Sequence, residues 1–378
     1  MQADSLDALD TAWMTRAVTL AEGGRGTASP NPMVGAVLVQ ADRPVGEGFH
    51  RAPGHPHAEA VALAQAGKLA AGATCYVTLE PCAHHGRTPP CADALIAAGV
   101  TRVVAAIEDP DPRVAGAGVA RLRAAGVQVT VGVGAELAAE QNAAFLIHRR
   151  LGRPRITLKA AASLDGKVAA ADGSSQWITG PAARADAHRL RAEADAIAVG
   201  AGTALADDPR LTVRLARPRG RPPLRVLVDG TGRVGTAGRL FDGEAPILVA
   251  TTAVAPTAAR RAWAAAGAEV LVCGDGDAGG GGVDLKLLAR QLAERDVLEL
   301  MVEGGPSLHA GFWAAGLADR LVWYLAPLVI GGDGAPGLFA GPGAASLAAA
   351  WPLEVRSVDR LGPDLRVVAV PGPAKEPR

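Results

Sequence analysis

Apolar and polar positions alternate along the first 150 residues in patterns typical of strands and helices. Short apolar runs predict strands at 33–40, 74–80, 102–107 and 127–133. Stretches in which apolar residues recur with helical spacing predict helices that begin near residues 5, 57, 91, 115 and 135. This alternation predicts an α/β layered domain for residues 1–150.

The segment 148–156, "HRRLGRPRI", is basic, contains glycine and proline, and separates two patterned regions, so we place a domain boundary there. A second alternation predicts strands from residue 156 and then at 195–201, 224–230, 245–251, 268–274, 298–305, 320–330 and 365–370. Its helices are predicted near 181–192, 256–266, 284–295 and 306–315. We therefore expect a second α/β domain at 154–372. The glycine-rich segment 274–284 predicts a flexible surface connection within it.

The length and charge of the chain narrow the classes of function. At 378 residues the chain exceeds what one hydrophobic core usually supports, so two domains are expected. Lysine plus arginine and aspartate plus glutamate both number 38, which removes the long-range field that a dedicated nucleic-acid binder needs. The expected partner is therefore a small-molecule substrate and not a nucleic acid.

The first residues of the chain and the number of cysteines indicate the cellular compartment of the protein. The first 21 residues carry acidic groups where a signal peptide needs a basic start and an apolar core, and no run of eighteen apolar residues occurs anywhere. Four cysteines in a chain of this length are no disulfide framework. These features predict a soluble cytoplasmic protein without membrane association. The sequence is compatible with a homo-oligomer but does not determine the oligomeric state.

Three residues near predicted helix starts have the chemistry of a zinc site. His57 follows a proline at the start of an Ala-rich helix, Cys82 follows a strand, and Cys91 opens another helix. One imidazole and two thiolates suit zinc, and helix N-termini favour thiolates. Three protein ligands leave one position for water, whose pKa the ion lowers to about 7.

Glu59 lies two residues after His57, where a carboxylate that is not a ligand can move protons between water and substrate. His-x-Glu followed by Pro-Cys and a second Cys is the signature of zinc-dependent base deaminases. Two alternatives remain open at this point. Glu59 could be a solvated helix residue, and His84 or His85 could close the shell as a fourth ligand and make the site structural.

The loop between the two cysteines, "AHHGRTPP", has eight residues where the commonest version of the signature has two. It contains His84, His85 and Arg87, which are able to bind an anion near the zinc. The loop therefore favours a phosphorylated substrate over a plain nucleoside.

The second half of the chain contains weaker sequence evidence for a binding site. The segment 302–312, "VEGGPSLHAGF", predicts a strand, a Gly-Gly turn and a helix start whose amides can bind phosphate, although many such turns contain glycine without a ligand. No Gly-x-Gly-x-x-Gly lies between a strand and a helix, so a Rossmann domain has little support. The polar segment 203–214, "TALADDPRLTVR", is either a capped turn with solvated charges or a substrate site whose arginines suit phosphate.

Several motifs together resemble the bifunctional riboflavin-biosynthesis deaminase/reductase family. "SPNPMVGAVLV", "GHPHAEA" and "TLEPCAHHGRTPPC" resemble its deaminase signature, and "LKAAASLDGKVA", "SQWITG" and "VEGGPSL" resemble its reductase signature. The resemblance implies a cytidine-deaminase-like three-layer α/β/α domain followed by a dihydrofolate-reductase-like α/β domain. It implies zinc-dependent deamination of 2,5-diamino-6-(5-phosphoribosylamino)pyrimidin-4-one. NADPH-dependent reduction of the ribosyl group of 5-amino-6-(5-phosphoribosylamino)uracil to ribityl would follow.

The resemblance also implies roles for individual residues. His57, Cys82 and Cys91 match the zinc ligands, and Glu59 matches the proton shuttle. The positions that match substrate residues are Asn31, His50, Arg87, Ser175, Arg191, Leu211, Arg214 and Glu303. The positions that match the cofactor site are Ala161, Trp177, Thr203, Asp207, Gly230, Gly305, Pro306, Ser307, Leu308, His309, Ala310 and Gly311.

Some of these implied roles have alternatives. Asn31 also fits a simple turn between two prolines. Gly230 stands where the family frequently has serine, so a hydroxyl contact to the cofactor is in doubt. Asp207, Asp208 or Glu303 could assist proton transfer in the reduction, and the sequence does not decide among them.

Three other functions compete with the two-activity enzyme. The second domain could be a nucleotide sensor without catalysis. The zinc site could act on a flipped base of a nucleic acid, although the balanced charge and an aromatic content of 3% argue against this. The protein could also be a purely structural zinc protein.

Overall fold

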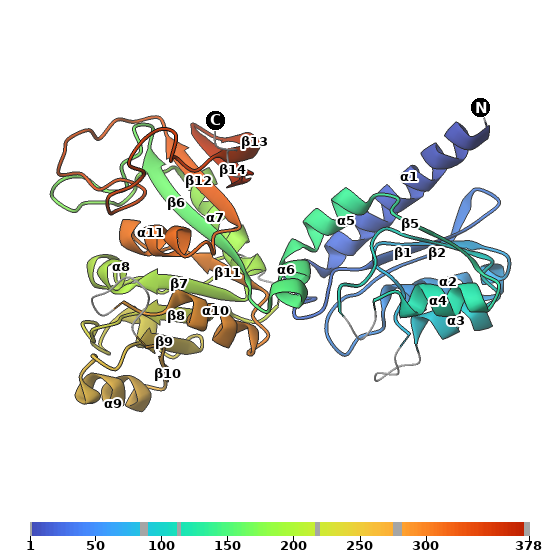
Figure 1. Cartoon of the computed structure of the whole chain (residues 1–378), viewed down its shortest axis with the longest axis horizontal. Coiled ribbons are helices and arrows are strands. Elements are labelled where there is room, and N and C mark those ends of the chain that lie inside the picture. Colours follow the sequence, from blue (N-terminus) through green and yellow to red (C-terminus); the bar gives the residue numbers. More distant parts are fainter. Residues whose placement is uncertain (1, 84–89, 112–114, 216–219, 275–281, 374–378) are drawn as a thin grey trace. The chain divides into compact units, whose positions relative to one another are not determined.

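The computed structural model describes residues 2–83, 90–111, 115–215, 220–274 and 282–373, with side chains from residue 7 onward. The chain forms two compact units, Met1–Gly152 and Arg153–Arg378, and each is built on its own sheet (Figure 1). None of the helices in the described residues is long and apolar enough to cross a membrane. Most of the predicted glycine-rich connection at 274–284 lies outside the described residues.

The first unit contains a five-stranded sheet. Its strands are β1 (Gly35–Gln40), β2 (Arg43–Phe49), β3 (Thr74–Val77), β4 (Arg102–Ala105) and β5 (Gln128–Val131). The strand order is β2-β1-β3-β4-β5, in which β1 is antiparallel to β2 and β3 whereas β3, β4 and β5 are parallel. The loops after the parallel strands β3 and β4 therefore meet at one edge of the sheet.

Helices cover both faces of this sheet and make three layers (Figure 1). The helices of the unit are α1 (Gln2–Ala21), α2 (Ala58–Ala66), α3 (Cys91–Ala97), α4 (Ala117–Ala124), α5 (Ala135–Gln141) and α6 (Ala143–Leu151), with 3-10 turns at Glu22–Gly24 and Gly67–Ala70. On one face, Met14 of α1 and Ala138 of α5 pack against strand residues such as Val37 and Tyr76. The helices α2, α3 and α4 lie on the other face. Burial of the apolar helix faces against the strands holds the layers together.

Two predictions for this unit need correction. The sequence did not predict β2, because "RPVGEGF" lacks apolar alternation. Gly46 and Gly48 of β2 press against α2, and a Cβ atom there would lie 2.1 Å from the Ala62 oxygen and 2.4 Å from the Ala58 oxygen. The closing helix, predicted as one, is divided at Asn142 into α5 and α6.

A buried carboxylate far along the sheet from the zinc ligands stabilises the first unit. Asp10 is 4% exposed and accepts hydrogen bonds from Tyr76 at 2.8 Å and from Arg102 at 2.5 and 2.8 Å. The hydrogen bond from Arg102 is the main cause that holds the pKa of Asp10 below its usual value. The stabilisation is therefore present above the unfolded pKa of about 3.9 and is lost as the pH falls through the lower folded value.

We expect Asp10→Asn to lower the free energy of unfolding of the first unit by about 1–3 kcal/mol at pH 7, because it weakens a buried charged hydrogen-bond network. Calorimetry of the full chain measures this effect. Asp7→Asn, on the exposed side of α1, is the control with no expected change. Equal melting of the Asp10 and Asp7 variants would contradict the prediction.

The second unit contains a nine-stranded sheet in the order β10-β9-β8-β7-β11-β6-β12-β14-β13. Its strands are β6 (Arg155–Ser163), β7 (Ala196–Gly200), β8 (Leu224–Val228), β9 (Ile247–Thr251), β10 (Glu269–Val272), β11 (Glu299–Val302), β12 (Arg320–Ala326), β13 (Leu353–Leu361) and β14 (Asp364–Pro371). The strands from β10 to β12 are parallel, and β14 and β13 are added antiparallel. In such a sheet, ligands bind beyond the carboxyl ends of the parallel strands.

Two apolar cores lie on the two faces of this sheet. The helices are α7 (Pro181–Glu193), α8 (Ala201–Asp207), α9 (Thr257–Ala265), α10 (Leu285–Ala293) and α11 (Pro306–Ala314), with a 3-10 turn at Arg239–Phe241. Leu288 of α10 and Phe312 of α11 pack in one core. Ala204 of α8 and Trp263 of α9 pack in the other.

The sequence missed two elements of the second unit. Residues 203–207 lie in α8 and not in a capped turn, because Ala201 and Ala204 are buried against the sheet and continue β7 directly into a helix. The edge strand β13 was missed because it is mostly exposed and charged, and its pairing with β14 holds it. Both elements depend on tertiary contacts and not on local apolar periodicity.

Candidate active sites

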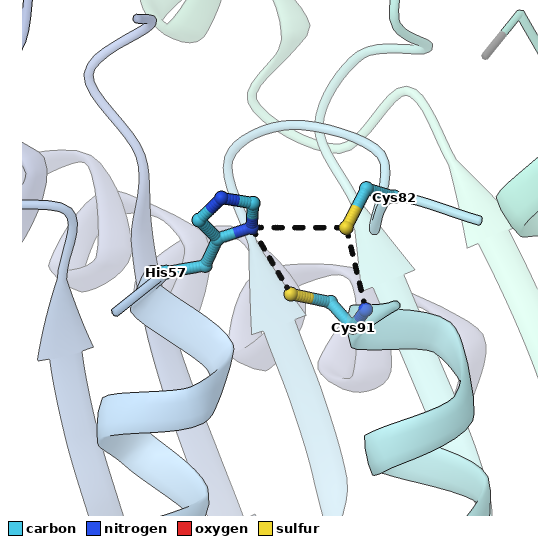
Figure 2. A group of neighbouring side chains, drawn as sticks. All are labelled: His57, Cys82 and Cys91. Carbon is cyan, nitrogen blue, oxygen red and sulfur yellow. Dashed lines mark hydrogen bonds between the residues drawn. The ribbon is translucent and has the colours of Figure 1, made fainter. Parts of the chain in front are cut away.

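Three predicted zinc ligands meet at the edge of the first sheet. His57 immediately precedes α2, Cys82 lies in the loop after β3, and Cys91 is the first residue of α3 (Figure 2). β2 and β3 are both antiparallel to β1, so the segments that follow them, which carry the three residues, begin at the same edge of the sheet. The N-termini of α2 and α3 thus direct their ligand residues toward one point.

The distances within this group fit a zinc ion. The Nδ1 atom of His57 lies 3.3 Å from the Cys91 Sγ atom and 3.7 Å from the Cys82 Sγ atom. Zinc with ordinary Zn–N and Zn–S bonds in a tetrahedral shell separates such atoms by about 3.6 Å. All three ligand atoms lie within 4.8 Å of one another, and among the described residues no other carboxylate, histidine or cysteine joins this cluster. The donor set therefore suits zinc, with three ligands from the described part of the chain.

The contacts within this group favour a thiolate at Cys82. A hydrogen bond from Cys91 is the main cause that lowers the pKa of Cys82 to about 4, and His57 adds to it. The same hydrogen bond, together with burial, raises the pKa of the Cys91 thiol. Contact with Cys82 also raises the pKa of His57. The site thus holds a negative charge on Cys82 ready for a cation.

Glu59 lies in the first turn of α2 and is only 4% exposed. Burial raises the pKa of its carboxyl, and the His57 charge acts in the opposite direction. A buried carboxyl beside a metal site can exchange protons with water and substrate, whereas a solvated helix residue has no such role. The alternative of a solvated Glu59 is therefore wrong.

Asn31 and His50 lie next to the metal cluster. The Nδ2 atom of Asn31 lies 3.0 Å from the Nε2 atom of His50, and the Nδ1 atom of His50 lies 3.1 Å from the Pro56 oxygen. The His50 ring meets the His57 ring edge to face at 5.5 Å. His84, His85 and Arg87, which the sequence suggested for a fourth ligand and an anion site, lie outside the described residues.

The second unit has a cavity of about 1440 Å³ at the carboxyl ends of β7, β8 and β11. Its wall includes Lys159 of β6, Gly200 at the end of β7 and Gly305 at the N-terminus of α11. The helix start has no side-chain cap, and although Pro306 carries no N–H group, the amides of Gly305 and Ser307 on either side of it suit a phosphate group. This volume is large enough for a dinucleotide together with a second ligand.

A buried ion-pair cluster forms one wall of the cavity. The Glu303 carboxylate accepts hydrogen bonds from Arg191 at 2.5 and 2.9 Å and from Lys159 at 3.4 Å. Burial alone would raise the pKa of Glu303, but the charges of Arg191 and Lys159 outweigh it and hold that pKa well below its usual range. Glu303 is therefore ionised and fixes two cations at the cavity wall.

The cavity brings together most of the residues predicted for substrate and cofactor in this half. Those at its wall are Ala161, Ser175, Trp177, Arg191, Thr203, Asp207, Leu211, Arg214, Glu303, Gly305, Pro306, Ser307, Leu308, His309 and Gly311. Gly230 and Ala310 are not among the lining residues. The Gly230 carbonyl accepts a hydrogen bond from Thr252 instead.

Sequence reasoning missed several cationic or titratable groups of the cavity wall, among them Lys159, Arg184 and His188. Lys159 is the charged residue in the mostly apolar segment "ITLKAAA", and this break in the pattern is the signal that could have identified it. Arg184 and His188 lie on α7, where polar residues are ordinary, so the sequence carried no comparable signal.

Comparisons with known proteins match both halves of the chain. Residues 8–107 match the family described as "Cytidine and deoxycytidylate deaminase zinc-binding region", and residues 154–367 match the "RibD C-terminal domain". The riboflavin biosynthesis protein RibD of Escherichia coli K12 is 44% identical over 367 residues, covering 94% of this chain and 98% of that protein. The RibD of Bacillus amyloliquefaciens is 42% identical over 96% of this chain and 97% of that protein. The chain belongs to the RibD family.

Solved structures of RibD proteins agree with the fold. Acinetobacter baumannii RibD superimposes with a TM-score of 0.87 at 38% identity, covering 97% of this chain and 99% of that one. A Thermotoga maritima structure, named as a diaminohydroxyphosphoribosylaminopyrimidine deaminase/5-amino-6-(5-phosphoribosylamino)uracil reductase, gives 0.83 at 33% identity with the same coverage. The predicted fold class, a cytidine-deaminase-like domain followed by a dihydrofolate-reductase-like domain, is confirmed.

Membership of the RibD family establishes the general function. The protein is a bifunctional enzyme of riboflavin biosynthesis with a deaminase and a reductase activity, and its cofactors are zinc and NADPH. The predicted function and cofactors are confirmed. The alternatives of a non-catalytic second domain, a nucleic-acid editor and a purely structural zinc protein are set aside.

Proposed function

We propose that residues 1–150 deaminate 2,5-diamino-6-(5-phosphoribosylamino)pyrimidin-4-one and that residues 154–372 reduce the ribosyl group of the product, 5-amino-6-(5-phosphoribosylamino)uracil, to ribityl. The observation that carries the proposal is the group of His57, Cys82 and Cys91 with the buried Glu59 beside it. The cavity of the second unit, with its phosphate-binding helix start, supports the second step.

In the deaminase half, His57, Cys82 and Cys91 would hold the metal. Bound zinc supplies the Lewis acidity that activates a water molecule. Glu59 would accept a proton from the attacking water and deliver it to the departing amine, which would leave as ammonia. Asn31 and His50 would hold the edge of the pyrimidine, because the His50 ring lies against His57 and Asn31 contacts His50.

In the reductase half, the start of α11 binds the dinucleotide phosphates through its free amides. Bound NADPH supplies the hydride, so the protein has mainly to position the sugar against it. Arg214 at the cavity wall suits the phosphate of the substrate, since a planar guanidinium fork binds such groups. The fork of Arg191 is held by Glu303, so Arg191 contributes positive charge at this wall. The sequence offered Asp207, Asp208 and Glu303 as groups that assist proton transfer. Of these, Glu303 accepts a hydrogen bond from Lys159, and the Lys159 ammonium is the group that can supply the proton.

The charge balance and the edge of the second sheet support the proposed partner, compartment and oligomeric state. The equal numbers of acidic and basic residues support a small-molecule partner without nucleic acid or membrane, in the cytoplasm. A homo-oligomer is supported by the edge strand β13, on which Val355 is 57% exposed and Val358 is 59% exposed. An edge strand leaves unpaired backbone N–H and C=O groups, with which a second copy of the chain can pair.

Product identification tests the proposal. The purified full-length protein is incubated with the diaminopyrimidine ribotide, with and without NADPH, and the products are identified by mass spectrometry. We expect deaminated ribotide without NADPH and its ribityl form with NADPH.

Removal of zinc with a chelator is expected to abolish deamination while reduction of the supplied deaminated ribotide continues. The expected selectivity follows because the three metal ligands and the NADPH cavity belong to separate units. NADPH oxidation is measured on the same sample. Loss of both activities on chelation, with recovery of both on adding zinc, would contradict the assignment of zinc to the deaminase half alone.

A further inference from the structure

Glu80 is a buried carboxylate that the mechanism above does not use. It follows β3 and is 4% exposed, although it comes only two residues before Cys82. Its two oxygens accept three backbone hydrogen bonds, from the amides of Asp109 at 3.1 Å, Gly116 at 3.0 Å and Val119 at 3.0 Å. Glu80 thus joins the loop that carries a zinc ligand to the loop after β4 and to the first turn of α4.

This junction is closely packed at the backbone. The Glu80 amide donates to the Ile107 oxygen at 2.9 Å, which continues the pairing of β3 and β4. Gly118 of α4 lies against Pro81, and a Cβ atom at Gly118 would be 1.9 Å from the Pro81 oxygen. The peptide between Glu80 and Cys82 is therefore held on one side by the carboxylate bonds and on the other by direct contact with α4.

Cys82 receives its remaining restraints from α3. The Cys91 amide donates to the Cys82 Sγ atom at 3.3 Å, and the Ala92 amide donates to the Cys82 oxygen at 3.2 Å. These bonds fix the thiolate only if the backbone that carries it is itself fixed. Glu80 meets that need, because its three bonds hold the residue two positions before Cys82 to the loop after β4 and to the first turn of α4.

We infer that Glu80 is a positioning residue of the zinc site, which acts by setting the backbone that carries Cys82. The inference rests on the proposed role of His57, Cys82 and Cys91 as ligands. A carboxylate suits the task because its two oxygens can accept all three backbone bonds, and the backbone N–H groups at the start of α4 favour such an acceptor. A neutral amide offers one acceptor oxygen and would place its NH2 group against a backbone donor.

The test measures zinc affinity of the full-length protein by competition with a chelator. We expect Glu80→Gln to bind zinc roughly 10-fold or more weakly, the range seen when groups behind metal ligands are changed. Its deaminase activity should recover when zinc is added in excess, while NADPH oxidation by the second unit stays at the wild-type level throughout. Gly118→Ala, which disturbs the same peptide from α4, should weaken zinc binding as well and serves if Glu80→Gln does not fold.

Two further variants separate the possible outcomes. Asp10→Asn removes an equally buried carboxylate of the same unit, with comparable hydrogen bonding but away from the metal ligands, and it should keep wild-type zinc affinity. If it loses affinity as Glu80→Gln does, general destabilisation explains the effect and the inference is overturned. Wild-type affinity in both Glu80→Gln and Gly118→Ala overturns it too. His57→Ala should release zinc, and if it does not, the ligand assignment itself fails.

Discussion

Replacement of Glu59 by glutamine is expected to reduce deamination by about 100-fold or more and to leave zinc in place. The side chain keeps its size and its buried position in α2, but it loses the ability to take up and release a proton. Positioned acids and bases contribute roughly 100- to 10,000-fold to such reactions, so the loss should be large. Ammonia release measures the rate, and metal analysis of the purified variant measures the zinc content.

The reductase activity of the same variant serves as an internal control. NADPH oxidation with supplied deaminated ribotide should match the wild type, because the cavity of the second unit contains no part of α2. Glu47→Gln, in the neighbouring strand β2, is a matched surface control, since Glu47 binds only the exposed Arg16 through its side chain. Deamination at the wild-type rate in Glu59→Gln would remove Glu59 from the proton path.

Replacement of Glu303 by glutamine is expected to have a comparable effect on the other activity. The change leaves Arg191 and Lys159 at the cavity wall without the carboxylate that orients them. Loss of one preorganised charged group in an active site commonly costs roughly 100- to 1,000-fold in rate. We therefore expect NADPH oxidation to fall by at least about 100-fold while deamination is unchanged, as measured by absorbance and by ammonia release.

Glu299 offers a close control for this variant. It lies at the start of β11, four residues before Glu303, and it is also buried, with hydrogen bonds from Arg155 at 2.5 Å and Thr157 at 2.6 Å. It does not line the cavity. Glu299→Gln should lower the melting temperature and retain the reductase rate, whereas equal loss of activity in both variants would indicate a purely structural role for Glu303.

Periodicity predicted most of the fold and failed in definable places. The buried strands and amphipathic helices were predicted because burial of one face leaves a repeat in the sequence. The strand β2 leaves no such repeat, since Gly46 and Gly48 are required by contact with α2 and not by a core. The helix α8 and the edge strand β13 likewise depend on partners distant in the sequence.

The two active sites also differ in how far the sequence alone could predict them. The zinc group could be predicted because His57, Glu59, Cys82 and Cys91 follow a spacing that reflects the chemistry of the ion. The reductase cavity has no comparable local spacing, and its residues come from β6, α7, α8 and α11. Lys159 and the role of Glu80 became evident only from the contacts of their side chains.

The contact between β2 and α2 has a consequence for sequence variation among related enzymes. Gly48 touches the backbone oxygen of Ala58, the residue that separates His57 from Glu59. Any larger side chain at Gly48 must displace the turn that carries a metal ligand and the proton shuttle together. Selection should therefore tolerate change at Gly48 as poorly as at the reacting residues themselves, and a mutational scan scored on growth without riboflavin would group this glycine with the active site.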